Sequence, residues 1–159
     1  MKTAQQWINE LEMTSHVEGG YFKEQLKSDQ TIHHNDHDRA LYTSILFLLE
    51  HDNPSNFHRL TADEIWYYHD GSPLTVHMIH PDGTYEQIKL GKDILNGEVL
   101  QAVVPRGVIF GSSVEEGYAL VSCMVAPGFE FEDFTLFKRQ ELLDLYPDHH
   151  EIIKKLTRN

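Results

Sequence analysis

A histidine and a glutamate lie six residues apart in this chain, and together they have the means to move a proton. They are His58 and Glu64, within residues 57–64. A neutral imidazole is suited to take a proton near pH 7, and a neighbouring carboxylate commonly fixes its tautomer and stabilises the imidazolium. The pair predicts a general base with an orienting carboxylate. The alternative is a His–Glu hydrogen bond that only stabilises the core.

Aromatic residues accompany this pair at strand spacing. Alternate residues of a strand share a face, so Trp66 and Tyr68 are expected on the face of Glu64. A pocket that holds His58, Glu64, Trp66, Tyr68 and Phe110 would have aromatic walls and a polar floor, which is typical of a small-ligand site. Tyr68 is the candidate acid, and a tyrosine that only packs is the alternative.

Three more side chains are candidate ligand contacts. Arg59 should point away from the face of His58, toward an anionic ligand at a subunit interface or into a surface ion pair. His77 lies in the middle of a predicted strand. Glu18 precedes Gly19-Gly20, where two glycines indicate a tight bend or a close backbone approach. Glu18 would then face a ligand, or the segment would only turn the chain into a strand.

The metal-ligand chemistry of the sequence is incomplete. Catalytic zinc generally takes three protein ligands, and His58 with Glu64 supplies two. His77 is the best third candidate, ahead of His69 and His80. Residues 33–38 are also rich in histidine and aspartate, which is typical of a metal-binding tract or of a solvated loop. We expect no metal cofactor, with a divalent metal held by an unusual third ligand as the alternative.

The elements that position these residues are mostly strands. Thr3 with Gln6 forms a capping-box pattern that predicts a helix over 4–12, and residues 28–38 are expected to be an exposed loop. Helical spacing around Leu142 and Ile153 predicts two short C-terminal helices, separated by Pro147, that pack outside the strands. Short runs bounded by turn residues predict strands over 21–26, 41–49, 57–60, 65–68, 74–79, 85–90, 100–104, 108–111, 118–125 and 129–136. The sequence therefore predicts an all-β sandwich or barrel with short terminal helices.

Composition narrows the classes of partner. The chain has 159 residues, which favours one domain over 1–159, and a formal net charge of −12, which disfavours nucleic-acid binding. Cys123 is the single cysteine, expected as a small core residue or else a reactive thiol, so no internal disulfide forms. No apolar stretch approaches about 20 residues. These features predict a cytoplasmic protein with no membrane partner.

Several motifs resemble those of the cupin superfamily. Residues 57–64, then Gly71, then Pro105-Arg106-Gly107 are similar to its two sequence boxes. In that pattern two histidines, a glutamate and a third histidine usually hold a divalent metal inside a small β-barrel. His58 and Glu64 match the pattern, whereas Leu60 and Phe110 stand where the other two histidines would be.

A closer resemblance is to one cupin family, DUF985 or cupin-5, over roughly residues 5–147. The segments that carry it are His16–Phe22, Ser44–Leu49, Phe57–Arg59, Asp63–Trp66, Val104–Gly107 and Val125–Phe129. The resemblance implies a single jelly-roll β-barrel, usually paired as a homodimer, but no settled reaction. Its barrels look similar to sugar-nucleotide 3,5-epimerases, which are metal-free cupins with a histidine base and a tyrosine acid.

Three functions follow from these patterns. The first is a metal-independent isomerase or epimerase of a small carbonyl-bearing or sugar-like molecule, with His58 as base, Glu64 as its orienting group and Tyr68 as acid. The second is a non-catalytic module that binds a small ligand in the same pocket. The third is a metal-dependent cupin enzyme with an atypical site, against which Leu60 and Phe110 count.

Overall fold

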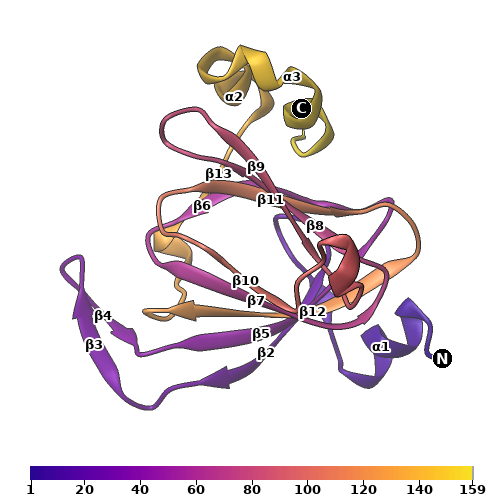
Figure 1. Cartoon of the computed structure of the whole chain (residues 1–159). Helices are drawn as coiled ribbons and strands as arrows, with labels where there is room; N and C mark the ends of the chain where they lie inside the picture. Colours follow the sequence, from indigo (N-terminus) through magenta and orange to yellow (C-terminus); the bar gives the residue numbers. More distant parts are fainter. Residues whose placement is uncertain (159) are drawn as a thin grey trace.

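The computed structural model describes residues 1–158, and strands dominate them (Figure 1). Two sheets face each other, which is the arrangement expected of a jelly roll. One sheet has the order β1 (Thr14–Ser15), β2 (Tyr21–Lys27), β5 (Thr43–Glu50), β12 (Tyr118–Ala126), β7 (Asp63–Gly71) and β10 (Gln101–Val104). The other has the order β13 (Phe134–Leu136), β6 (Ser55–Leu60), β11 (Ile109–Val114), β8 (Leu74–Ile79) and β9 (Tyr85–Leu90).

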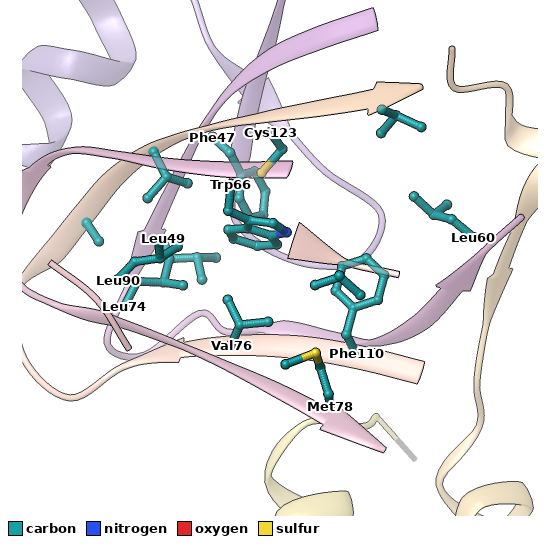
Figure 2. Packing of buried hydrophobic residues seen from close by; sticks show 14 of the residues in the cluster. Phe47, Leu49, Leu60, Trp66, Leu74, Val76, Met78, Leu90, Phe110 and Cys123 are labelled. Carbon is teal, nitrogen blue, oxygen red and sulfur yellow. The ribbon is translucent and has the colours of Figure 1, made fainter. Parts of the chain in front are cut away.

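The inner faces of the two sheets enclose the main core. Strand β12 pairs with β5 and β7 and brings Cys123 beside Trp66, while β11 pairs with β6 and brings Phe110 beside His58. Figure 2 shows Trp66 between Phe47 and Cys123 on one side and Phe110 on the other. The alternation of apolar side chains along these strands therefore places one aromatic layer inside the barrel.

The helices at both ends of the chain are confirmed. Helix α1 (Ala4–Glu10) has the predicted capping box of Thr3 and Gln6, and ends two residues earlier than expected. Helices α2 (Arg139–Leu145) and α3 (His150–Lys155) are joined by η3 (Pro147–His149) and lie on the outer side of the second sheet, at the top of Figure 1. Within residues 1–158, no helix is long and apolar enough to cross a membrane.

The exposed loop predicted over residues 28–38 is wrong, because most of it is a β-hairpin. Strands β3 (Thr31–His34) and β4 (His37–Ala40) pair with each other across a turn in which Asn35 and Asp36 have φ of 50° and 65°. Positive φ at both central residues matches the right-handed twist of a hairpin, and Asn and Asp tolerate it. Most side chains of the hairpin are exposed and polar, so the apolar alternation that reveals a strand is missing.

Two other connections are partly helical. The polar stretch over 91–98 contains the short helix η1 (Ile94–Asn96). The strand expected over 129–136 is shorter, because η2 (Phe131–Asp133) precedes β13. This change matters for function, because the aromatic residues of that stretch reach the cavity described next.

Candidate functional site

A cavity of about 110 Å³ opens at one end of the space between the sheets. Its walls are largely aromatic and come from β2, β5, η2, β13 and the segment before η2; the rings belong to Phe22, Phe47, Phe129, Phe131 and Phe134. Its polar lining consists of His16, Glu18, Glu24, Thr43, His58, Glu64 and Cys123. His58 and Glu64 therefore line an aromatic cavity, but none of the predicted rings, Trp66, Tyr68 and Phe110, is among its lining residues.

His58 is a neutral base in this cavity. It is 2% exposed, and its Nδ1 lies 2.7 Å from the carbonyl oxygen of Asn56. A carbonyl only accepts, so Nδ1 carries the proton and Nε2 is left as an acceptor, 3.4 Å from a carboxylate oxygen of Glu18. Burial lowers the pKa of His58 to about 4, against the opposing effect of the Asn56 hydrogen bond. At neutral pH the imidazole is therefore uncharged.

The bend at Gly19 and Gly20, which follows Glu18, positions the Glu18 side chain next to His58. Gly19 and Gly20 have φ of +117° and +77°, and a Cβ atom at Gly19 would lie 2.0 Å from the carbonyl oxygen of Pro54. Only glycine permits both the conformation and the approach. The amide N–H and the side-chain amide of Asn56 both donate to the Glu18 carbonyl, at 2.7 and 2.9 Å. The bend therefore turns the chain and also aims Glu18 into the cavity.

The carboxyl group of Glu18 has three polar neighbours. The Ser55 hydroxyl donates to one oxygen, and that oxygen also faces His58. The other oxygen lies 3.4 Å from Nδ1 of His16. Burial raises the pKa of Glu18, and the charge of His16 and the Ser55 hydrogen bond act against this rise. Glu18, which the sequence placed only as a ligand contact, is thus the carboxyl group that faces the candidate base.

Glu64 holds a proton at neutral pH. It is buried, and burial is the main reason that its pKa rises to about 8, with the charge of Glu18 adding to the rise and a hydrogen bond with Cys123 opposing it. The prediction that Glu64 orients His58 is wrong, because the Asn56 carbonyl and Glu18 make those contacts. The physical reason is the bend at Gly19 and Gly20, which aims Glu18, rather than Glu64 of β7, at Nε2 of His58.

Three predicted residues lie behind the cavity or beside it. Phe110 packs on His58 with 4.1 Å between ring centroids, and Trp66 packs on Phe110 at 6.3 Å (Figure 2). Both rings support the cavity but neither lines it. Tyr68 packs against the core, and its hydroxyl donates to the Gly71 carbonyl at 2.6 Å. The structure therefore does not place Tyr68 opposite His58 as the partner acid.

Arg59 and His77 lie outside the barrel. Arg59 is exposed and its guanidinium lies 5.1 Å from the ring centroid of Phe137, so it points away from the face of His58 as expected. His77 is buried under the outer surface, within hydrogen-bond distance of the hydroxyls of Tyr85 at 2.6 Å and Ser113 at 2.8 Å. Neither residue lines the cavity.

Sequence reasoning missed several lining residues. Phe22 and Glu24 alternate along β2, and this period would have placed both on the inner face. Cys123 and Val125 on β12 also line the cavity together. The cluster of phenylalanines over 129–134 was an available signal, since three aromatic side chains so close together after a strand need a partner surface.

The donors in the cavity do not fit a divalent metal. Leu60 lines the cavity and Phe110 packs on His58, so apolar side chains occupy the positions where the cupin pattern has its other histidines. Among residues 1–158, no group of three or more His, Cys, Asp or Glu side chains is arranged to hold a metal ion. This includes the tract over 33–38, where His33 contacts Asp38 at 3.1 Å.

Comparisons with known proteins agree with this fold. Residues 5–137 match the model of the cupin superfamily family DUF985. An uncharacterised protein of Saccharomyces cerevisiae is 36% identical over 157 residues, which cover 87% of this chain and 77% of that protein.

Solved structures are similar over the whole chain. A protein of Shewanella oneidensis is 46% identical, with a TM-score of 0.94 over 99% of both chains, and a hypothetical protein of Leishmania major is 39% identical, with the same score over 99% of this chain and 100% of that one. A Bacillus subtilis oxalate decarboxylase variant shares the fold alone, at 14% identity and a TM-score of 0.58 over 36% of its length. The jelly-roll prediction is therefore confirmed, and the chain belongs to the DUF985 family of the cupin superfamily.

Proposed function

We propose that this protein isomerises or epimerises a small carbonyl compound by proton transfer between its own side chains. The observation that supports this most directly is the pairing of a neutral base and a protonated acid in one cavity. His58 is neutral with Nε2 available, and Glu64 retains its proton at neutral pH. Groups whose pKa values are pushed apart in this way commonly act as base and acid.

The base is His58 assisted by Glu18. Nε2 takes a proton from the carbon next to the substrate carbonyl, and the Glu18 carboxylate stabilises the imidazolium that forms, since an opposite charge at 3.4 Å favours the charged imidazole. This assistance matters because a histidine with a pKa of about 4 is a weak base on its own.

The acid is Glu64. Its carboxyl proton passes to the substrate carbonyl oxygen as His58 removes the carbon-bound proton, which leaves a neutral enol and an ionised Glu64. Where the carbon next to the carbonyl bears a hydroxyl group, the intermediate is an enediol. The His58 imidazolium then returns its proton to the former carbonyl carbon while Glu64 takes the proton of the other hydroxyl group, which gives the isomer. If water instead delivers a proton to the opposite face of the original carbon, Glu64 takes back the enol proton and His58 releases its proton to water, which gives the epimer. The apolar rings strengthen these electrostatic interactions by excluding water.

Hydrogen–deuterium exchange tests this proposal. In D₂O, NMR should show enzyme-dependent loss of the proton next to the carbonyl in a panel of small aldehydes and ketones. His58→Gln and Glu64→Gln should each slow this exchange by about 10²-fold or more. Tyr68→Phe is the control and should retain the exchange, because Tyr68 does not line the cavity.

Two results would contradict the proposal. One is exchange that Glu64→Gln leaves unchanged. The other is no enzyme-dependent exchange with any carbonyl compound that binds. Circular dichroism of each variant separates these results from loss of the fold, and unfolding of the His58 variant would make that residue structural.

A binding module without catalysis is the second candidate. Glu18 favours it, because Ser55, His16 and His58 already surround its carboxyl group, and such a satisfied network needs no chemistry to explain it. A bound ligand that is recovered unchanged after long incubation would support this role. A homodimer, from the resemblance, and a cytoplasmic location, from the composition, stay predictions.

A further inference from the structure

The charge of the cavity lining restricts which charge a bound ligand can carry. Three glutamates line the cavity: Glu18 and Glu64 are buried within it, and Glu24 is exposed at its mouth. Among the residues that the structure describes, no lysine or arginine joins them. Burial lowers the pKa values of both lining imidazoles, His16 and His58, and so favours their neutral forms. Glu64 keeps its proton, so the carboxylates of the lining are Glu18 and Glu24. A buried charge usually has a cationic partner, and the described lining provides none that is permanently charged.

Arginine is present close by but is already engaged. Arg39 lies on β4, and its Nε and Nη2 donate to the two carboxylate oxygens of Asp133 at 2.8 and 3.1 Å. Glu132 accepts from the same guanidinium. Arg39 is therefore already paired with two carboxylates of η2 and does not offset the charge of the cavity lining.

The aromatic rings of the lining also favour a cationic ligand. Phe129, Phe131 and Phe134 pack edge to face, with 5.0 to 6.0 Å between ring centroids. Phe131 is 60% exposed, and all three rings line the cavity. The face of an aromatic ring attracts a cation, and cages of such rings are a common way to bind ammonium groups.

An anionic ligand would lack partners here. Phosphates and carboxylates are bound by arginine, lysine or ordered backbone N–H groups, and the described lining presents glutamates instead. A nucleotide-linked sugar carries a pyrophosphate, so it fits poorly despite the likeness of cupin barrels to sugar-nucleotide epimerases.

From the carboxyl groups and the rings together, we infer that the ligand of this cavity is a small organic cation, a primary amine that also bears a carbonyl group. The amine follows from the lining, whereas the carbonyl group rests on the function proposed above. The ammonium group pairs with the carboxylates of Glu18 and Glu24, since Glu64 keeps its proton, and the cavity of about 110 Å³ restricts the ligand to a few heavy atoms.

Three similar ketones test this inference. Aminoacetone, hydroxyacetone and pyruvate share a methyl ketone and differ in charge, being cationic, neutral and anionic. Ligand-observed NMR titrations with the full chain should give aminoacetone about tenfold higher affinity than hydroxyacetone and show no saturable binding of pyruvate. Equal or weaker binding of aminoacetone, or no binding of any of the three, would overturn the inference.

A pair of charge variants locates the effect. Glu24→Gln removes the negative charge at the mouth and should weaken aminoacetone binding by roughly two- to fivefold, while hydroxyacetone binding stays constant. Glu116→Gln removes an exposed charge that does not line the cavity, and it should change neither affinity. Equal effects of the two variants would show that only the net charge of the protein attracts the amine, and would contradict a cation site in the cavity.

Hydrogen–deuterium exchange in the same samples, measured in D₂O, distinguishes the cation site from the isomerase activity. Aminoacetone that binds selectively but shows no exchange of its carbon-bound protons would preserve the cation site and contradict the isomerase. Exchange of hydroxyacetone in preference to aminoacetone would preserve the isomerase and contradict the cation site.

Discussion

A carboxyl group that is buried away from water keeps its proton up to a higher pH, and Glu64 is an example of this effect at the scale of one residue. Burial raises its pKa to about 8, so an ordinary acidic side chain becomes a proton donor at neutral pH. His58 shows the opposite case, because burial lowers its pKa to about 4 and leaves it neutral. The roles of these residues in the cavity follow from desolvation more than from their identity.

Substitution of Glu64 should change how stability depends on pH. The pKa of Glu64 is higher in the folded state than its ordinary value near 4.5, so the folded state binds the extra proton between these values. Its contribution to the free energy of unfolding is therefore lost as pH rises from about 4.5 to about 8. We expect Glu64→Gln to be more stable than the wild type at pH 9, by on the order of a few kcal/mol.

Urea unfolding at pH 6 and pH 9 measures this difference. Glu116→Gln is the control, because its side chain is exposed and should leave the pH dependence of the wild type unchanged. A Glu64 variant that loses as much stability as the wild type between the two pH values would show that this carboxyl group is not the source.

The sequence named three of the polar residues of the site but not the contacts between them. His58, Glu64 and Glu18 were predicted to face a ligand, and all three line the cavity. The partner of His58 depends on the opposing sheet and on a glycine bend, where Glu18 is aimed by contacts with residues 54–56. Such contacts between distant segments leave no periodic signal in a single sequence.

At the scale of elements, the β3–β4 hairpin holds the segment that covers the cavity. Arg39 of β4 contacts Asp133 and Glu132 of η2, and the Gly128 N–H donates to the Ala40 carbonyl at 2.7 Å. Phe131 lies in the same short helix and lines the cavity. The hairpin was hidden in the sequence because its strands are polar, so its role as a support was hidden too.

Breaking this contact should make the cavity open more often. Cys123 is the single cysteine, is 2% exposed and lines the cavity, so its reaction with a thiol reagent reports on opening. We expect Arg39→Met to speed the labelling of Cys123 by Ellman's reagent by roughly tenfold, because local openings that expose a buried group become more frequent when the contacts that hold them are removed.

Lys155→Met provides the matched control for this measurement. Lys155 pairs with Glu115 at 3.8 Å and does not line the cavity, so its removal should leave the labelling rate unchanged. Labelling that keeps pace with global unfolding in both variants would show that Cys123 is reached only when the whole barrel unfolds, and that the Arg39 contact does not control entry.

At the scale of the whole molecule, the two C-terminal helices add a second core on the outside of the sheets. Periodicity predicted most of the strands and the terminal helices, because each is a local pattern. It also predicted that the C-terminal helices pack outside the strands, but it did not predict which sheet they cover, since their apolar faces fit any apolar surface. In the structure they cover the outer face of the second sheet, where Ile153 and Leu156 pack with Phe57, Ile79 and Ile109.

Because of this second core, we expect a substitution far from the cavity to lower the free energy of unfolding strongly. Ile153 is fully buried, so Ile153→Ala should leave a cavity under α3 and lower the free energy of unfolding by about 2–5 kcal/mol. Leu145→Ala, at a position that is 62% exposed, should cost far less. Thermal and urea unfolding of the two variants measure the difference. Equal losses would mean that the C-terminal helices add little to the stability of the fold. A selective loss at Ile153 would show that the second core, on the outer face of the second sheet, stabilises the strands between which the cavity lies.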